Sequence, residues 1–129
     1  MSRTVLIAES HKFLLEVLTA MLSLLGFSVV YNTSNRRDIE ALTLKTKPQL
    51  LLFDFNLPGA GEAGDPDLKR LKAQIPELKI LGLGHQDLTD EIVERMLKHG
   101  FDGFCSKYDQ RSGFLKAISA LFPDFKPKS

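Results

Sequence analysis

A carboxylate that ends an apolar run is the first candidate for chemistry in this chain. Residues 50–54 read LLLFD, so Asp54 follows four apolar residues, and NLPG follows it at 56–59. A second apolar run, TVLIA at 4–8, is followed at once by Glu9 and Ser10. A buried charge is costly unless it is paired or holds a metal, so a carboxylate placed there indicates a function. Local turn hydrogen bonds are the plainer interpretation.

The elements that must position these residues form a regular alternation. Short apolar runs cover 4–8, 27–31, 50–54, 79–83 and 103–106, and helical segments cover 10–25, 34–46, 66–75, 89–99 and 110–122. Continuous apolar runs are typical of parallel strands that are covered by helices on both faces. The pattern predicts an α/β domain, a flavodoxin-like doubly wound sheet of five parallel strands in the order 2-1-3-4-5, flanked by five helices.

In such a sheet the working site lies at the carboxyl ends of the strands, where the direction of the connections reverses. For this strand order the reversal falls between strands 1 and 3. Glu9 and Asp54 leave those two strands, so we expect their carboxylates to meet in a crevice. This pairing favours function over local turn bonds.

Residues that begin and end helices agree with the alternation. Ser10, Ser34, Asp65 and Thr89 are predicted N-caps, Pro66 suits a first helical position, and Gly26 and Gly100 suit the helix ends. Residues 13–31 carry one charge, but the spacing within them predicts an amphipathic helix followed by a strand, not a membrane span.

Composition limits the class of protein. The chain has 129 residues, which suits one domain, and we expect a domain at 1–123 with a short C-terminal tail or linker start at 124–129. Lys and Arg number 17 against 16 Asp and Glu, without a basic stripe, so we expect no direct binding of nucleic acid. A single cysteine, Cys105, and no secretory signal favour the cytoplasm.

The motifs resemble those of response regulator receiver domains, the phosphoryl-accepting modules of two-component signalling. VLIAESH stands at the family's acidic pair, LLFDFNLPG at its acceptor segment, LGLGH at its hydroxyl position, and GFCSK at its aromatic and lysine. The resemblance implies that Asp54 is the phosphoryl acceptor and that Lys107 contacts the phosphoryl group. It also implies that Glu9, Asp54 and the backbone carbonyl of Asn56 bind Mg²⁺.

Two positions and one segment depart from the family pattern. Ser10 replaces the second acid, which predicts weak binding of Mg²⁺ because a neutral hydroxyl is a poor ligand for this ion. Gly84 replaces the Thr or Ser that contacts the phosphoryl group. Phe104 holds the place of the switch aromatic and is expected to point inward beside Gly84. The segment AGEAGD at 60–65 is longer than is usual for the family, and we interpret it as a tolerated insertion.

Two versions of a receiver-like function therefore stay open. One accepts a phosphoryl group from a sensor histidine kinase or a phosphotransfer protein, and the other is a phosphate-independent pseudo-receiver that acts through protein contacts. In either version the surface of helix 4, strand 5 and helix 5 could form a homodimer, with Glu94, Lys98, Lys116 and Ser119 on it. No enzyme is expected.

Two other classes fit the sequence less well. A phosphatase that forms an aspartyl phosphate would need an acid at position 56, which is Asn56. A flavin-binding protein would need a phosphate-binding loop after strand 1, and AESHKF does not supply one.

Overall fold

The computed structural model describes residues 3–54, 57, 66–84, 89–106 and 111–124. The strands are β1 (Arg3–Ala8), β2 (Phe27–Thr33), β3 (Leu50–Asp54), β4 (Lys79–Gly84) and β5 (Gly103–Ser106). The helices are α1 (Lys12–Leu24), the short 3-10 helix η1 (Arg36–Asp38), α2 (Ile39–Thr46), α3 (Leu68–Gln74), α4 (Asp90–Lys98) and α5 (Arg111–Leu121).

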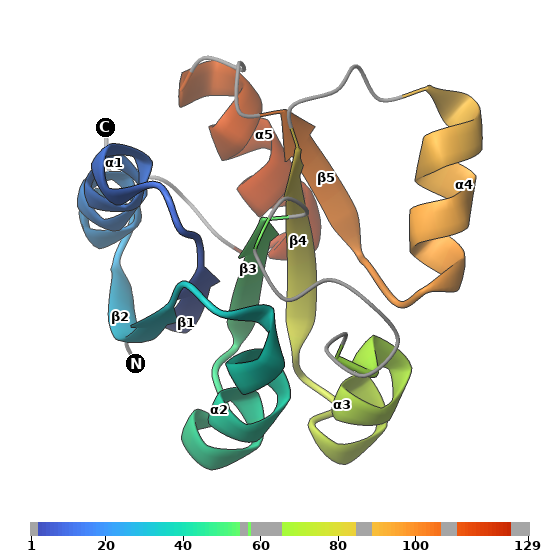
Figure 1. The fold of residues 1–129 in the computed structure, drawn as a ribbon. Helices are drawn as coiled ribbons and strands as arrows, with labels where there is room; N and C mark the ends of the chain where they lie inside the picture. The colour runs from blue at the N-terminus through green and yellow to red at the C-terminus, as the bar shows by residue number, and fades with distance from the viewer. Residues whose placement is uncertain (1–2, 55–56, 58–65, 85–88, 107–110, 125–129) are drawn as a thin grey trace.

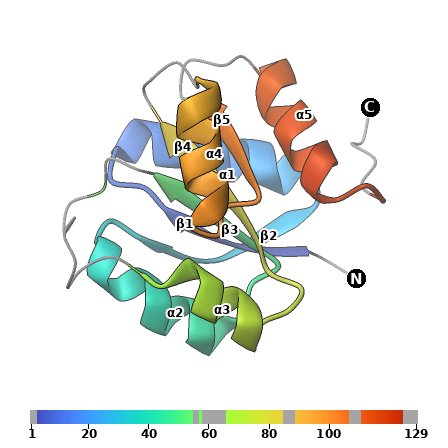
Figure 2. The ribbon, with the colours of Figure 1, turned by 90° about the vertical axis from the view of Figure 1, so that its right-hand side faces the viewer.

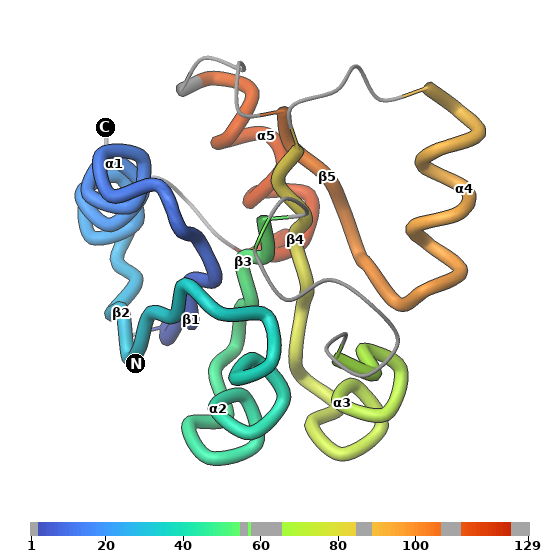
Figure 3. Tube along the Cα trace, viewed as in Figure 1, coloured from blue at the N-terminus to red at the C-terminus, as the bar shows by residue number. Residues whose placement is uncertain are grey.

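The five strands form one parallel sheet in the order β2-β1-β3-β4-β5 (Figure 1). The predicted fold class is therefore confirmed. Along β3 every side chain is buried, as expected for a central strand that is covered on both faces. The tube in Figure 3 shows how α1 returns the chain from β1 to β2, and how η1 and α2 return it from β2 to β3.

Two apolar clusters lie on opposite faces of the sheet. One joins the strands to α1 and α5 through residues such as Leu18, Leu22 and Ile118. The other joins them to α2 and α3 through Ile39 and Leu71, with Met96 of α4 packed against it. Figure 2, turned by 90°, shows α2 and α3 together on one side of the sheet and α5 on the other. Alternate residues of each strand point to opposite faces, so β3 and β4 supply both clusters.

Several predicted N-caps are wrong by one or two residues. His11 caps α1, since its Nδ1 accepts from the backbone N–H of Leu14 at 3.3 Å, and Ser10 does not. Asn35 precedes η1 in place of Ser34, and Asp67 caps α3, so Pro66 lies outside the helix. The predicted cap at Asp65 lies outside the described residues. Thr89 does cap α4, through a bond from the N–H of Ile92 at 3.2 Å.

The predicted helix ends are at the two expected glycines. Gly26 and Gly100 have φ angles of 91° and 109°, a region that favours glycine. Gly100 is also needed for packing, because a Cβ there would lie 3.0 Å from the Cβ of Leu68. The end of α4 therefore lies directly against the beginning of α3.

The apolar side of α1 is wider than its contact with the core. Leu18 and Leu22 are buried, whereas Phe13 is 70% and Leu24 66% exposed. The prediction of a helix followed by a strand is confirmed. Within the described part of the chain, no helix is long and apolar enough to cross a membrane.

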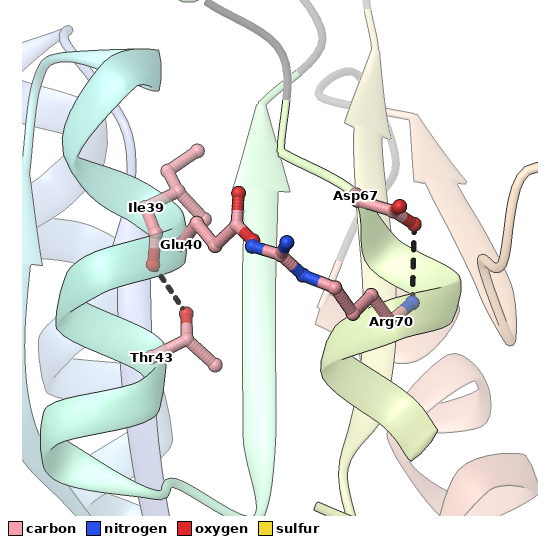
Figure 4. A network of polar contacts seen from close by, with 5 residues as sticks. All are labelled: Ile39, Glu40, Thr43, Asp67 and Arg70. Atoms are coloured by element: carbon pink, nitrogen blue, oxygen red, sulfur yellow. Dashed lines mark hydrogen bonds and ion pairs between the residues drawn. The ribbon is translucent and has the colours of Figure 1, made fainter. Parts of the chain in front are cut away.

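Polar contacts hold α3 in place. The side chain of Arg70 forms an ion pair with Glu40 of α2, and Asp67 Oδ1 accepts from the N–H of Arg70 at 3.1 Å (Figure 4). At the other end of the helix, Lys72 pairs with Asp102, whose Oδ2 accepts from the N–H of Ile80 at 2.8 Å. These contacts join α3 to α2, to β4 and to the segment that enters β5.

Candidate functional site

The two predicted carboxylates lie at the same edge of the sheet, on neighbouring strands. Ala8 of β1 pairs with Phe53 of β3, and the next residue on each strand is Glu9 and Asp54. Each side chain belongs to a residue that is 1% exposed. The sheet therefore brings the two acids to adjacent positions. This placement was predicted because the direction of the connections reverses between β1 and β3.

Backbone donors orient the Glu9 carboxylate. Its Oε2 accepts from the N–H groups of Ser10 at 2.8 Å and His11 at 3.0 Å. The N–H of Glu9 donates to the carbonyl oxygen of Thr33 at 3.0 Å, which extends the pairing with β2. These bonds explain why the N-cap of α1 is His11, one residue later than predicted. The backbone N–H of Ser10 donates to Glu9, and the side chain of Ser10 is exposed.

Asp54 is held by its pairing with β4. It is the last residue of β3 and pairs with Leu83 of β4, and its carbonyl oxygen accepts from the N–H of Leu57 at 3.3 Å. The acceptor position is thus fixed by regular structure on its N-terminal side.

Two adjacent buried carboxylates repel each other, and a divalent cation between them offsets that repulsion. Mg²⁺ prefers a shell of hard oxygen ligands, so the donor chemistry of Glu9 and Asp54 fits this ion. Ser10 adds only a neutral hydroxyl at an exposed position. Among the residues that the structure describes, no group of three or more His, Cys, Asp or Glu could hold a metal. Asn56 and Lys107, the other predicted contacts, lie outside the described residues.

Glycines shape the half of the edge that β4 and β5 form. Gly84 is buried at the end of β4 and pairs with Ser106. Gly82 pairs with Phe53 on one side and Phe104 on the other. Sequence reasoning singled out Gly84 and missed Gly82, although the repeat LGLG carries both. By strand alternation the two glycines face the same side of the sheet as Ile80, so beyond Ile80 the carboxyl end of β4 offers no side chain there.

Aromatic rings occupy the space over this part of β4. The Phe101 ring lies 5.7 Å from the Phe53 ring and 5.7 Å from the Phe104 ring, in tilted arrangements typical of aromatic pairs. Phe104 is half-buried and packs against the cluster on the α2 and α3 side. Its expected inward orientation beside Gly84 stays a prediction.

The segment 60–65, which the sequence indicates as a tolerated insertion, lies outside the described residues. Glu94 and Lys98 are exposed on α4, and Lys116 is exposed on α5. Ser119 of α5 is half-buried. The predicted partner surface therefore presents both signs of charge, as its sequence indicates.

A family model described as "Response regulator receiver domain" matches residues 5–119. No curated protein sequence matches the chain.

Solved structures with the same fold include the signal receiver domain of the putative response regulator NarL from Mycobacterium tuberculosis. It is 22% identical, with a TM-score of 0.76 over 92% of this chain and 94% of that one. A two-component response regulator of the LuxR family from Aurantimonas sp. SI85-9A1 is 18% identical, with a TM-score of 0.80 over 100% of this chain and 91% of that one. The isolated receiver domain of RcsB from Salmonella enterica serovar Typhimurium, solved with the phosphomimetic BeF3-, is 22% identical, with a TM-score of 0.78 over 98% and 92%.

Proposed function

Because the chain belongs to the response regulator receiver domain family, we propose that Asp54 accepts a phosphoryl group and that the domain signals through protein contacts. The observation that carries this proposal is the placement of Glu9 and Asp54, both 1% exposed, at the carboxyl ends of paired strands. The donor would be a sensor histidine kinase or a phosphotransfer protein in the cytoplasm.

The proposed reaction is a transfer to a carboxylate. An oxygen of Asp54 attacks the phosphorus of the donor, the bond from phosphorus to the donor's leaving group breaks, and its electron pair goes to that group. An acyl phosphate remains on Asp54. Lys107 would balance part of its negative charge as a positive point charge.

Mg²⁺, when bound, would neutralise charge on the phosphoryl oxygens. Glu9, Asp54 and the backbone carbonyl of Asn56 would hold it. The bonds from the N–H groups of Ser10 and His11 fix Glu9 Oε2 against the backbone that precedes α1. With a serine at position 10, the site offers one carboxylate fewer than the family pattern, and we expect weak affinity for Mg²⁺.

The substitutions also support a second candidate, a pseudo-receiver that works without phosphate. Gly84 supplies no hydroxyl for a phosphoryl oxygen, and Ser10 supplies no charge for the metal. In both versions the exposed charges of α4 and α5, including Glu94 and Lys116, would steer a homodimer or another partner.

Intact mass after incubation with phosphoramidate and Mg²⁺ tests the choice between these candidates. We expect the mass to rise by one phosphoryl group, and Asp54→Ala to remove that increase. Asp67→Asn is a matched control, because Asp67 is an aspartate that caps α3 away from the site and asparagine is also a good cap. A chain that stays unmodified over hours would reject the phosphoryl acceptor and favour the pseudo-receiver.

A further inference from the structure

A cavity of about 580 Å³ opens between the beginning of α3, the end of α4 and the helix η1. Its described lining consists of Arg36, Phe53, Pro66, Asp67, Leu68, Lys69, Met96, Lys98, His99 and Phe101. The proposed phosphorylation chemistry uses none of these side chains. Cavities of roughly 300–1,000 Å³ accommodate small organic ligands.

The floor of the cavity is apolar. Phe53 and Phe101 pack against each other with ring centroids 5.7 Å apart, and Leu68 and Met96 belong to the apolar cluster below them. The close approach of Gly100 to Leu68, where a Cβ would lie at 3.0 Å, fixes the ends of α3 and α4 that form two of the walls. This floor suits the hydrocarbon part of a ligand.

The charged groups of the cavity are mostly cations. Arg36, Lys69 and Lys98 contribute three basic side chains, and Asp67 is the one carboxylate in the described lining. The Asp67 carboxylate already accepts a hydrogen bond from the backbone N–H of Arg70 at 3.1 Å. The remaining positive charge suits an anionic head group.

Arg36 links the charged and apolar parts. Its guanidinium carbon lies 5.2 Å from the centroid of the Phe53 ring, which is within the range of a cation–π contact. A half-buried arginine that lies over an aromatic floor is placed to contact a carboxylate whose hydrocarbon body rests on that floor.

From this combination we infer that the cavity binds an amphipathic organic anion, a small carboxylate on an aliphatic or aromatic body. The inference does not depend on phosphorylation of Asp54. Phe53, which precedes Asp54, and Phe101, whose ring lies 5.7 Å from that of Phe104, both belong to the floor. A ligand there would therefore contact both halves of the candidate site through their aromatic neighbours.

Titration of the full chain with decanoate, followed by amide NMR, tests the inference. We expect saturable shifts at Lys69, Met96 and Phe101 with monomeric decanoate, and much smaller shifts with decanol, which lacks the charge. Lys69→Glu and Lys98→Glu should each weaken the binding of decanoate about tenfold, as expected for reversal of a charge near the head group at a partly exposed site.

Lys45→Glu is the matched control. Lys45 is exposed in the last turn of α2, as Lys98 is in the last turn of α4, so both reversals remove a favourable interaction with a helix end. Only Lys98→Glu should weaken decanoate, while both should lower the unfolding temperature to a similar extent. Equal binding of decanol and decanoate, or equal weakening by Lys45→Glu, would overturn the inference. Binding to phosphatidylglycerol vesicles without binding of monomeric decanoate would overturn it as well.

Discussion

The β1–β3 half of the carboxyl edge and the β4–β5 half differ in what their side chains can do. On the first half, two carboxylates are buried at adjacent positions, and backbone donors orient one of them. On the second half, Gly82 and Gly84 leave the carboxyl end of β4 without side chains on the face that carries Ile80, and aromatic rings pack there. The difference supports the proposal that accepting a phosphoryl group and responding to it are separate tasks of separate strands, and that the residues of this chain suit mainly the first.

The largest effect should come from the oriented carboxylate. Glu9→Gln would remove the negative charge but keep an oxygen that can accept from the Ser10 and His11 N–H groups, so the fold should persist. We expect the rate of phosphorylation by phosphoramidate to fall by about 100-fold, because charge stabilisation at a transferring group of this kind is worth several kcal/mol. Intact mass against time measures it.

Glu16→Gln is the control for that change, since Glu16 is an exposed acid on α1. It should leave the rate unchanged. An unchanged rate in Glu9→Gln would show that Glu9 takes no part in the proposed reaction. The proposed difference between the two halves would then be wrong.

A smaller effect is expected from restoring the missing acid. Ser10→Asp adds a carboxylate beside Glu9, and we expect Mg²⁺ affinity to rise about tenfold, since carboxylate ligands set the affinity of such sites. Amide shifts during a Mg²⁺ titration measure the change. The unmodified chain should respond little at low millimolar Mg²⁺, and tight binding by it would contradict our account of Ser10.

A substitution in the aromatic β4–β5 half should lower the stability of the fold and leave the phosphorylation rate unchanged. Phe104→Leu would remove a ring that packs on Phe101 but keep an apolar side chain, so we expect the free energy of unfolding to fall by about 1 kcal/mol. Urea denaturation measures the change. The phosphorylation rate should stay the same. A large loss of rate would contradict separate roles and would show that the two halves act as one functional unit.

The smallest effect concerns the surface of α4 and α5. Reversal of exposed charges in Glu94→Lys and Lys116→Glu should change self-association only a few-fold at low salt, because exposed charge pairs contribute about 0.2–1 kcal/mol. Sedimentation at two salt concentrations measures it. No change at either salt concentration would place the partner surface elsewhere, and the exposed Phe13 and Leu24 of α1 would be the next region to test.

The sequence predicts the sheet well because the signal is local. The runs at 50–54 and 103–106 match β3 and β5 residue for residue, and the strand order places Glu9 beside Asp54. The N-cap of α1 was predicted at the wrong residue because the backbone N–H of Ser10 donates to the Glu9 carboxylate. That contact depends on the burial of Glu9.

Features that depend on packing between distant segments could not be predicted in the same way. Gly82 matters because it lies between Phe53 and Phe104, which are about fifty residues apart in sequence. The cavity joins η1, α3 and α4, and its charges are scattered among ordinary surface residues in the sequence. The exposure of Phe13 likewise depends on which side chains of α1 pack against the sheet, and these are Leu18 and Leu22.

The central claim is that the domain accepts a phosphoryl group but responds weakly to it. The direct test is to phosphorylate the unmodified chain and Gly84→Thr, and to compare amide shifts near Asp54 with those of Phe104 and α4. We predict that the unmodified chain shifts mainly around Glu9 and Asp54, whereas Gly84→Thr also shifts Phe104 and α4, because the added hydroxyl contacts the phosphoryl group. Shifts at Phe104 and α4 that are equally large in the unmodified chain would contradict the claim.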